Sequence, residues 1–219
     1  MKSLDDVVWS AMRCGLWLAA KAYNVKVYGL ESVETENAAL FAVKHSSSLD
    51  CPVMLHLLPK KPVTFVTKGV FAHQTTNYVL RVAGMMPINS PVDNTLHRNG
   101  IDIAAFRSMF KTWQENGFGM YAPEGTRILG SVRETVYPDL IMMAAEHGHN
   151  VYLVGIRYGS NHPVLSFLRP RGQAGIEVRI EPYDAKGKPE MQVAEEIKER
   201  LGWLSGLEQR VTQEISHQI

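Results

Sequence analysis

Two short segments of the chain carry the residue types that acid–base chemistry needs. His45 comes directly after an apolar run and is followed five positions later by Asp50. The segment Pro123-Glu124-Gly125-Thr126-Arg127 follows another apolar run and combines a carboxylate, a glycine and a guanidinium. An imidazole held by a carboxylate can act as a general base. A turn with a carboxylate and a guanidinium can hold a hydroxylated or phosphorylated acceptor.

The sequence around His45 predicts a strand that leads into a helix. Leu40–Lys44 has the pattern of a buried strand, and Ser47 with Asp50 resembles a capping box at a helix start. His45 would then lie at the carboxyl end of the strand, where ligands collect in open α/β sheets. Asp50 would accept a hydrogen bond from one ring nitrogen, and the other nitrogen would take a proton.

Two other interpretations of this segment stay open. In the first, Asp50 only caps the helix and His45 is an incidental polar residue. In the second, one of the three serines after His45 is the nucleophile of a hydrolase. No Gly-x-Ser-x-Gly elbow surrounds these serines, so base-catalysed transfer is favoured over the hydrolase.

The second segment is expected to form a rigid turn. Pro123 fixes its own φ angle, and Gly125 permits a positive φ or a close backbone approach. Glu124 would bind an acceptor hydroxyl, and Arg127 would hold phosphate or carboxylate in a bidentate fork. The alternative is an ordinary surface turn with an ion pair.

Strand-like and helix-like runs alternate along the chain, which predicts an α/β fold with a mostly parallel sheet flanked by helices. The expected strands are Val25–Tyr28, Leu40–Lys44, Val63–Thr67, Met85–Ile88, Gly119–Ala122, Val151–Arg157 and Ile176–Ile180. The expected helices lie near Pro52–Leu58, Thr76–Val82, Ile101–Asn116, Leu140–His147 and Met191–Leu207.

Composition narrows the class of protein. With 219 residues and 45% hydrophobic content, the chain can bury one sizeable core. A net charge of +1 without a basic run argues against nucleic-acid binding. Two cysteines imply no disulfide framework and favour a reducing compartment. His147 and His149 are two positions apart and do not share a helix face, so no metal site is predicted.

The N-terminal segment, residues 1–23, predicts an amphipathic helix, and residues 24–219 would form the α/β domain. One face of the helix carries Val8, Trp9, Met12, Leu16, Ala19, Ala20 and Tyr23. This face could pack on the protein's own core, or it could lie in a membrane interface with Trp9 at headgroup depth. No run of about 18 apolar residues occurs, so no transmembrane helix is expected.

The order of these segments resembles the glycerolipid acyltransferase family, whose type member is 1-acylglycerol-3-phosphate acyltransferase. His45 with Asp50 resembles the first of four family blocks, and Pro123–Arg127 resembles the third. Lys68–Phe71 followed by Gly84–Asn89 is similar to the second, and Val151–Ile156 to the fourth. The N-terminal helix is similar to a membrane-docking element of the family.

The resemblance implies an O-acyltransferase of phospholipid biosynthesis. It would move a fatty acyl group from acyl-CoA or acyl carrier protein onto a lysolipid hydroxyl, without a metal or bound cofactor. His45 and Asp50 would be catalytic. The residues Lys68, Glu124, Gly125, Thr126 and Arg127 would bind substrate. The protein would be peripheral at the cytoplasmic face of a membrane.

Two departures from the family pattern bear on the acceptor. The second block usually ends in an arginine for the acceptor's phosphate, where this chain has Asn89-Ser90, and Val136–Asp139 replaces a Phe-Lys-x-Gly segment. A lysolipid with a headgroup other than phosphatidate is therefore an alternative acceptor. A non-catalytic lipid-binding protein of the same fold is the alternative function.

Overall fold

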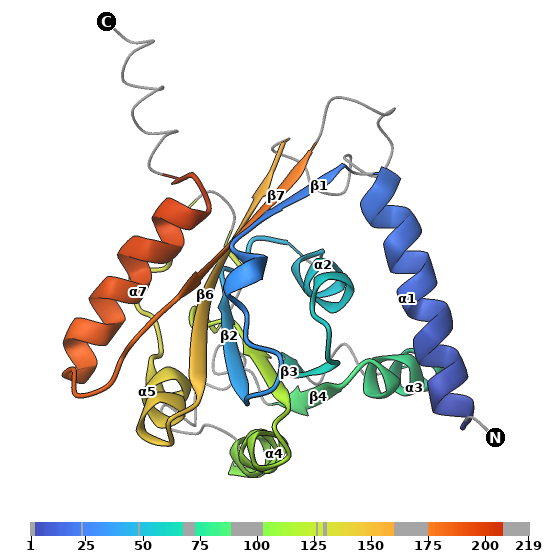
Figure 1. Ribbon diagram of the computed structural model, residues 1–219, viewed down its shortest axis with the longest axis horizontal. Coiled ribbons are helices and arrows are strands. Elements are labelled where there is room, and N and C mark those ends of the chain that lie inside the picture. Colours follow the sequence, from blue (N-terminus) through green and yellow to red (C-terminus); the bar gives the residue numbers. More distant parts are fainter. Residues whose placement is uncertain are drawn as a thin grey trace, which may run out of the picture.

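The computed structural model describes residues 3–22, 24–47, 49–67, 73–88, 103–125, 127–128, 131–159 and 175–207 (Figure 1). The strands are β1 (Val25–Tyr28), β2 (Ala39–Val43), β3 (Pro62–Thr67), β4 (Met85–Ile88), β5 (Phe118–Tyr121), β6 (Asn150–Tyr158) and β7 (Ile176–Pro182). The helices are α1 (Leu4–Ala22), α2 (Asp50–Leu57), α3 (Gln74–Val82), α4 (Ile103–Gln114), α5 (Asp139–Glu146) and α7 (Glu190–Leu204), with a short 3₁₀ helix, η1 (Leu30–Ser32).

These strands form a seven-stranded sheet in the order β1-β7-β6-β2-β5-β3-β4. From β6 to β4 every neighbouring pair is parallel. At the other end, β7 runs antiparallel to β6, and β1 is parallel to β7. The predicted α/β fold with a mostly parallel sheet is confirmed, and each expected strand is present with small shifts at its ends.

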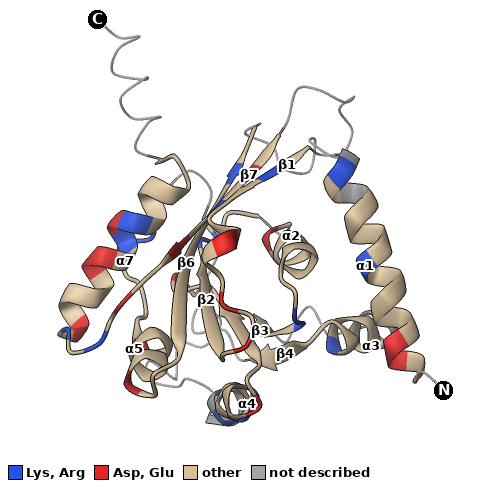
Figure 2. Ribbon diagram, viewed as in Figure 1, with Lys and Arg blue, Asp and Glu red and all other residues tan. Residues whose placement is uncertain are grey.

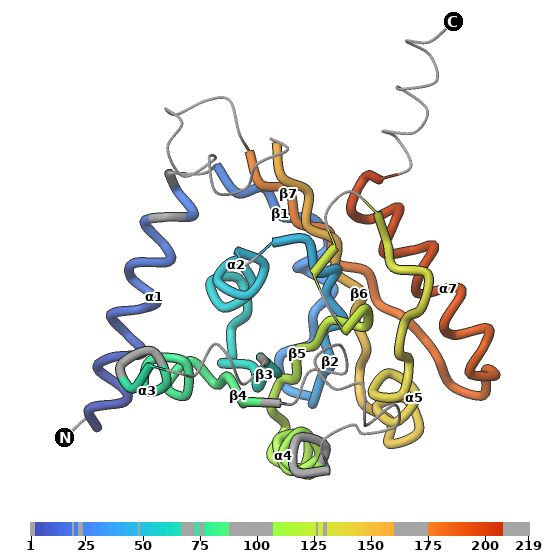
Figure 3. Tube along the Cα trace, turned by 180° about the vertical axis from the view of Figure 1, so that it is seen from behind, coloured from blue at the N-terminus to red at the C-terminus, as the bar shows by residue number. Residues whose placement is uncertain are grey.

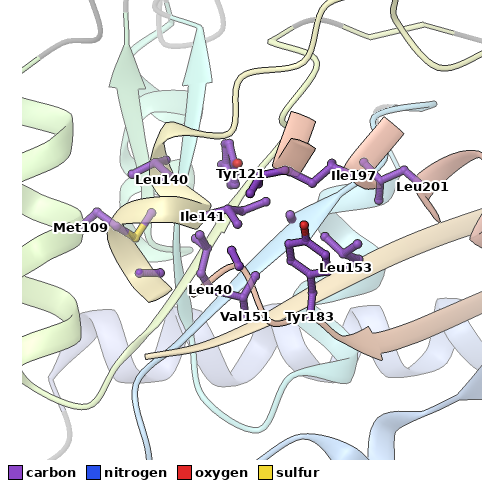
Figure 4. Packing of buried hydrophobic residues seen from close by; sticks show 14 of the residues in the cluster. Leu40, Met109, Tyr121, Leu140, Ile141, Val151, Leu153, Tyr183, Ile197 and Leu201 are labelled. Carbon is purple, nitrogen blue, oxygen red and sulfur yellow. The ribbon is translucent and has the colours of Figure 1, made fainter. Parts of the chain in front are cut away.

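Side chains of the central strand β2 alternate between two buried layers, as the period of a strand requires. Leu40 and Ala42 face the layer covered by α4, α5 and α7, which Figure 4 shows in detail. Phe41 and Val43 face the opposite layer, where α2 packs. The Phe41 ring stacks on Tyr152 with 5.2 Å between centroids. A strand buried on both faces is apolar throughout, which explains why its sequence shows no alternation.

Helix α1 lies outside α2 and α3 (Figures 1 and 3). Its partly buried residues Trp9, Met12 and Leu16 pack against a small cluster of Leu55, Ala83 and Met85. Of the two alternatives for this face, packing on the protein's own core is the one that these three side chains adopt. The other side of α1 exposes further apolar side chains, Leu4, Val7, Trp17 and Leu18.

The charged residues of α1 lie near its two ends, with Arg13 between them. Figure 2 shows acidic residues near the N-terminal end and a basic residue near the C-terminal end, which are Asp5, Asp6 and Lys21. This arrangement complements the helix dipole. Within the described part of the chain, no helix has both the length and the apolar character needed to span a bilayer.

Candidate active site

The two predicted chemical segments meet because their strands are neighbours. β2 and β5 run parallel, so the turns that follow Val43 and Tyr121 emerge at the same edge of the sheet. The amide of Ile128 donates a hydrogen bond to the carbonyl oxygen of His45 at 2.9 Å. The amide of His45 donates to Oε2 of Glu124 at 3.0 Å. The turn that carries the imidazole is therefore tied to the glutamate turn by one backbone–backbone hydrogen bond and by one bond from a backbone amide to the Glu124 carboxylate.

His45 and Asp50 form the expected pair. Nδ1 of His45 lies 3.0 Å from Oδ2 of Asp50. The Asp50 side chain is only 4% exposed, whereas the His45 side chain is 35% exposed. A carboxylate is an acceptor, so the proton of neutral His45 belongs on Nδ1 and Nε2 keeps a free lone pair. The geometry is that of a base whose tautomer is set by its neighbour.

The Asp50 carboxylate is anchored by several further donors. Its Oδ2 also accepts from the amides of Ser46 and Ser47, each at 2.8 Å. Its Oδ1 accepts from the hydroxyl of Tyr158 at the end of β6, at 2.5 Å. Burial and the charge of Asp50 raise the pKa of the Tyr158 hydroxyl far above its ordinary value, so this group stays protonated and donates. The same carboxylate therefore holds the turn that precedes α2 and orients His45.

Glu124 has a different role from the one expected. Its side chain is fully buried, and Oε1 lies 3.0 Å from Nζ of Lys44, which is fully buried too. Oε1 also accepts from the amide of Arg133 at 3.0 Å, and Oε2 accepts from the amide of His45. Because both oxygens are engaged inside the protein, the structure does not support binding of an acceptor hydroxyl by Glu124. The carboxylate instead holds the two turns together.

The other predicted substrate-binding residues are only partly described. Gly125 has a positive φ of 64°, as the turn requires, and its amide donates to the carbonyl oxygen of Ala122 at 3.0 Å. Arg127 is exposed, two residues beyond Gly125 and next to Ile128, which is bonded to His45. Thr126 and Lys68 lie outside the described residues.

Three residues of this region were not assigned a role from the sequence, namely Lys44, Arg133 and Tyr158. Lys44 directly follows β2, whose residues are all apolar, and a lysine in such a place is a usable signal for a buried ion pair. The guanidinium of Arg133 donates to the carbonyl oxygen of Glu124 at 3.0 Å. Tyr158 is 108 residues from Asp50, and no local pattern connects the two.

His147 and His149 lie away from this site, directly after α5. The His147 and His149 rings stack with 6.1 Å between centroids, and Nδ1 of His147 is 2.9 Å from the carbonyl oxygen of Met143. Within the described ranges, no group of three or more histidine, cysteine, aspartate or glutamate residues could hold a metal ion.

The parallel α/β sheet and the His45–Asp50 pair at its edge agree with the comparison of the chain with known families. The family model described as Acyltransferase matches residues 24–159, more than half of the chain. The chain therefore belongs to the acyltransferase family and is an acyltransferase. The matched segment contains His45, Asp50, the glutamate turn and Tyr158.

A solved structure with a similar fold is the crystal structure of the 1-acyl-sn-glycerophosphate (LPA) acyltransferase, PlsC, from Thermotoga maritima. The two chains are 19% identical, with a TM-score of 0.66 over 95% of this chain and 84% of that chain. At this identity the likeness shows the fold. No curated protein gives a significant match to the sequence.

Proposed function

We propose that this acyltransferase moves a fatty acyl group from a thioester, acyl-CoA or acyl carrier protein, onto the hydroxyl of a lysolipid. The observation that carries this proposal is the His45–Asp50 pair, with 3.0 Å between Nδ1 and Oδ2 and a partly exposed imidazole. Such a pair removes a proton from a hydroxyl that is otherwise a weak nucleophile. A positioned base of this kind contributes about 10²–10⁴-fold to a rate.

In the proposed reaction, Nε2 of His45 takes the proton of the acceptor hydroxyl as its oxygen attacks the thioester carbonyl carbon. The tetrahedral intermediate collapses, the C–S bond breaks, and the thiolate leaves with the proton returned by the imidazolium. The new bond is an oxygen ester and the products are the acylated lipid and the free thiol. The thiolate is a good leaving group, so transfer is direct and needs neither an acyl-enzyme nor a bound cofactor. Asp50 stabilises the transient imidazolium, as a buried partner does in a catalytic triad.

Of the three serines after His45, Ser47 is poorly placed to be a nucleophile. Ser47 is buried, and its hydroxyl oxygen accepts from the amide of Leu49 at 3.2 Å. Its own amide is bonded to Asp50. A nucleophile must face its substrate, and this serine faces the protein interior.

For the acceptor, we propose a lysolipid with an anionic headgroup of the lysophosphatidate type. Arg127 is exposed beside the imidazole turn and offers the planar fork that binds phosphate in two-point contact. The similar solved structure is described as an acyltransferase for 1-acyl-sn-glycerophosphate. Because Asn89-Ser90 stands where the family has an arginine, a lysolipid with another polar headgroup is the second candidate.

We further propose peripheral attachment at the cytoplasmic face of a membrane, through the outer side of α1. Val7 is 53% exposed, Trp17 is 45% exposed and Leu18 is 57% exposed. Lys21 lies 4.0 Å from the centre of the Trp17 ring, where it would remain in water or meet anionic headgroups. A lysolipid acceptor is held in a bilayer, so this attachment would bring the active site to its substrate.

The test is acyl transfer from labelled acyl-CoA and from acyl carrier protein to a panel of lysolipids with different headgroups. We expect transfer to lysophosphatidate by the wild type and its loss in His45→Ala. Binding of lysolipid without transfer from either donor would contradict the proposal and favour the non-catalytic lipid-binding alternative. Transfer only to lysolipids without a phosphomonoester would keep the reaction and change the acceptor.

A further inference from the structure

Tyr158 connects a third strand to the catalytic pair. It is the last residue of β6, which is the neighbour of β2 on the side away from β5. The residue is only 6% exposed, and its hydroxyl donates to Oδ1 of Asp50 at 2.5 Å. The phenol therefore lies between the helix start and the histidine turn.

Packing of the Tyr158 ring does not explain why this residue carries a hydroxyl. The ring belongs to the apolar layer that contains Phe41 and Ile156, and a phenylalanine would fill the same space. Burying a hydroxyl is unfavourable unless it is hydrogen-bonded, and here its acceptor is a carboxylate that already orients the base. The presence of a tyrosine at this position is thus tied to Asp50.

The two oxygens of Asp50 are held unequally. Oδ2 accepts from the amides of Ser46 and Ser47 as well as from His45. Among the described residues, Oδ1 accepts from Tyr158 alone. Without the Tyr158 hydroxyl, only the hydrogen bonds to Oδ2 would oppose rotation of the carboxylate about χ2. The preferred range of χ2 in aspartate is broad, so the orientation of the carboxylate depends on its hydrogen-bond partners.

We propose that Tyr158 is a positioning residue of the acyl transfer reaction, acting through Asp50 to keep His45 in the Nδ1–H tautomer. The expected fall in kcat rests on the proposed function. The expected effect on the tautomer of His45 does not. When Oδ1 is anchored, Oδ2 stays directed at Nδ1, and Nε2 remains the nitrogen that takes the proton.

The first measurement compares Tyr158→Phe with Tyr152→Phe. Tyr152 lies on the same strand and in the same apolar layer, six residues earlier and about 20 Å away along the strand. Its hydroxyl is also bonded, to the amide of Glu34 at 3.0 Å and the carbonyl oxygen of Ser32 at 3.1 Å. The two variants therefore lose the same chemical group from one strand, and only one of them touches Asp50.

We expect Tyr158→Phe to lower kcat about 10-fold, the range for one hydrogen bond to a charged group, with KM changed less than about 2-fold. Tyr152→Phe should keep kcat within about 2-fold of the wild type. Because Tyr158 acts through Asp50, adding Tyr158→Phe to Asp50→Asn should cause no further loss. Equal losses in the two tyrosine variants, or losses that multiply in the double variant, would overturn the proposal.

The second measurement needs no substrate, so it separates this inference from the proposed function. The ring ¹⁵N shifts of neutral His45, assigned by their absence in His45→Gln, report which nitrogen carries the proton. We expect the Nδ1–H form in the wild type and in Tyr152→Phe, and a mixture of both tautomers in Tyr158→Phe. An unchanged tautomer in folded Tyr158→Phe would refute the positioning role even if acyl transfer is confirmed. A mixture would support it even if no acceptor is found.

Discussion

Replacing Glu124 by glutamine tests whether this residue joins the two turns or contacts the acceptor. The Glu124 carboxylate and the Lys44 ammonium are 3.0 Å apart, and both side chains are 0% exposed. In Glu124→Gln the one remaining side-chain oxygen can accept either from Lys44 and the Arg133 amide, or from the His45 amide. The NH₂ group takes the other position, where it faces an N–H donor instead of an acceptor. In both cases the Lys44 charge stays buried without a counter-charge.

Removing one partner of a buried ion pair costs about 3–5 kcal/mol. This is a large part of the roughly 5–15 kcal/mol that stabilises a typical domain. With a denaturant slope of about 2 kcal/mol per molar urea, the unfolding midpoint should fall by roughly 1.5–2.5 M. Urea titration followed by circular dichroism measures this shift, and an unchanged slope shows that the two-state description still holds.

The double variant Lys44→Met with Glu124→Gln is the matched control. It removes the uncompensated charge, so it should be more stable than Glu124→Gln alone by at least about 1 kcal/mol. If Glu124→Gln instead costs less than about 1 kcal/mol and raises KM for the acceptor, Glu124 faces the substrate. The structural role assigned to it would then be refuted.

Two further predictions concern the acceptor and the membrane. Arg127→Lys should raise KM for the acceptor several-fold and leave KM for the acyl donor unchanged, because a point charge cannot reproduce a bidentate fork; equal effects on both substrates would indicate a structural role. The double variant Val7→Glu with Leu18→Glu should no longer sediment with anionic liposomes, while its stability changes by less than about 1 kcal/mol, because both side chains are exposed. In contrast, Trp9→Glu or Leu16→Glu should lower the free energy of unfolding, because these side chains pack on the core. Unchanged sedimentation of the Val7→Glu/Leu18→Glu variant would show that the outer side of α1 binds no membrane.

The elements of the fold were predictable because strand and helix patterns are local. Near-continuous apolar runs such as Phe118–Tyr121 belong to strands that are buried on both faces. The order of the strands was not predictable, since nothing local states that β7 turns antiparallel beside β6. The orientation of α1 was not predictable for another reason. Apolar residues lie on both of its sides, Trp9 and Leu16 inward and Val7 and Leu18 outward, and periodicity does not rank two apolar faces.

The candidate site shows the same division between local and distant information. His45 and Asp50 are five residues apart, so the chain itself brings them together. The contacts of Glu124 with the His45 amide and of Tyr158 with Asp50 span 79 and 108 residues. They depend on which strands become neighbours. The sequence does not distinguish a buried glutamate from one that binds substrate. For this reason the sequence predicts acceptor binding by Glu124, whereas the structure buries its carboxylate.

The central claim is that His45 is a general base held in its tautomer by Asp50, and the turnover of Asp50→Asn tests it most directly. The amide can present a donor to Nδ1 and favour the wrong tautomer, while the space that it fills is the same. Acyl transfer from a saturating thioester to lysophosphatidate should then show a kcat lower by about 10²–10⁴-fold, in a protein whose circular dichroism matches the wild type. A folded Asp50→Asn protein with near wild-type kcat would contradict the claim.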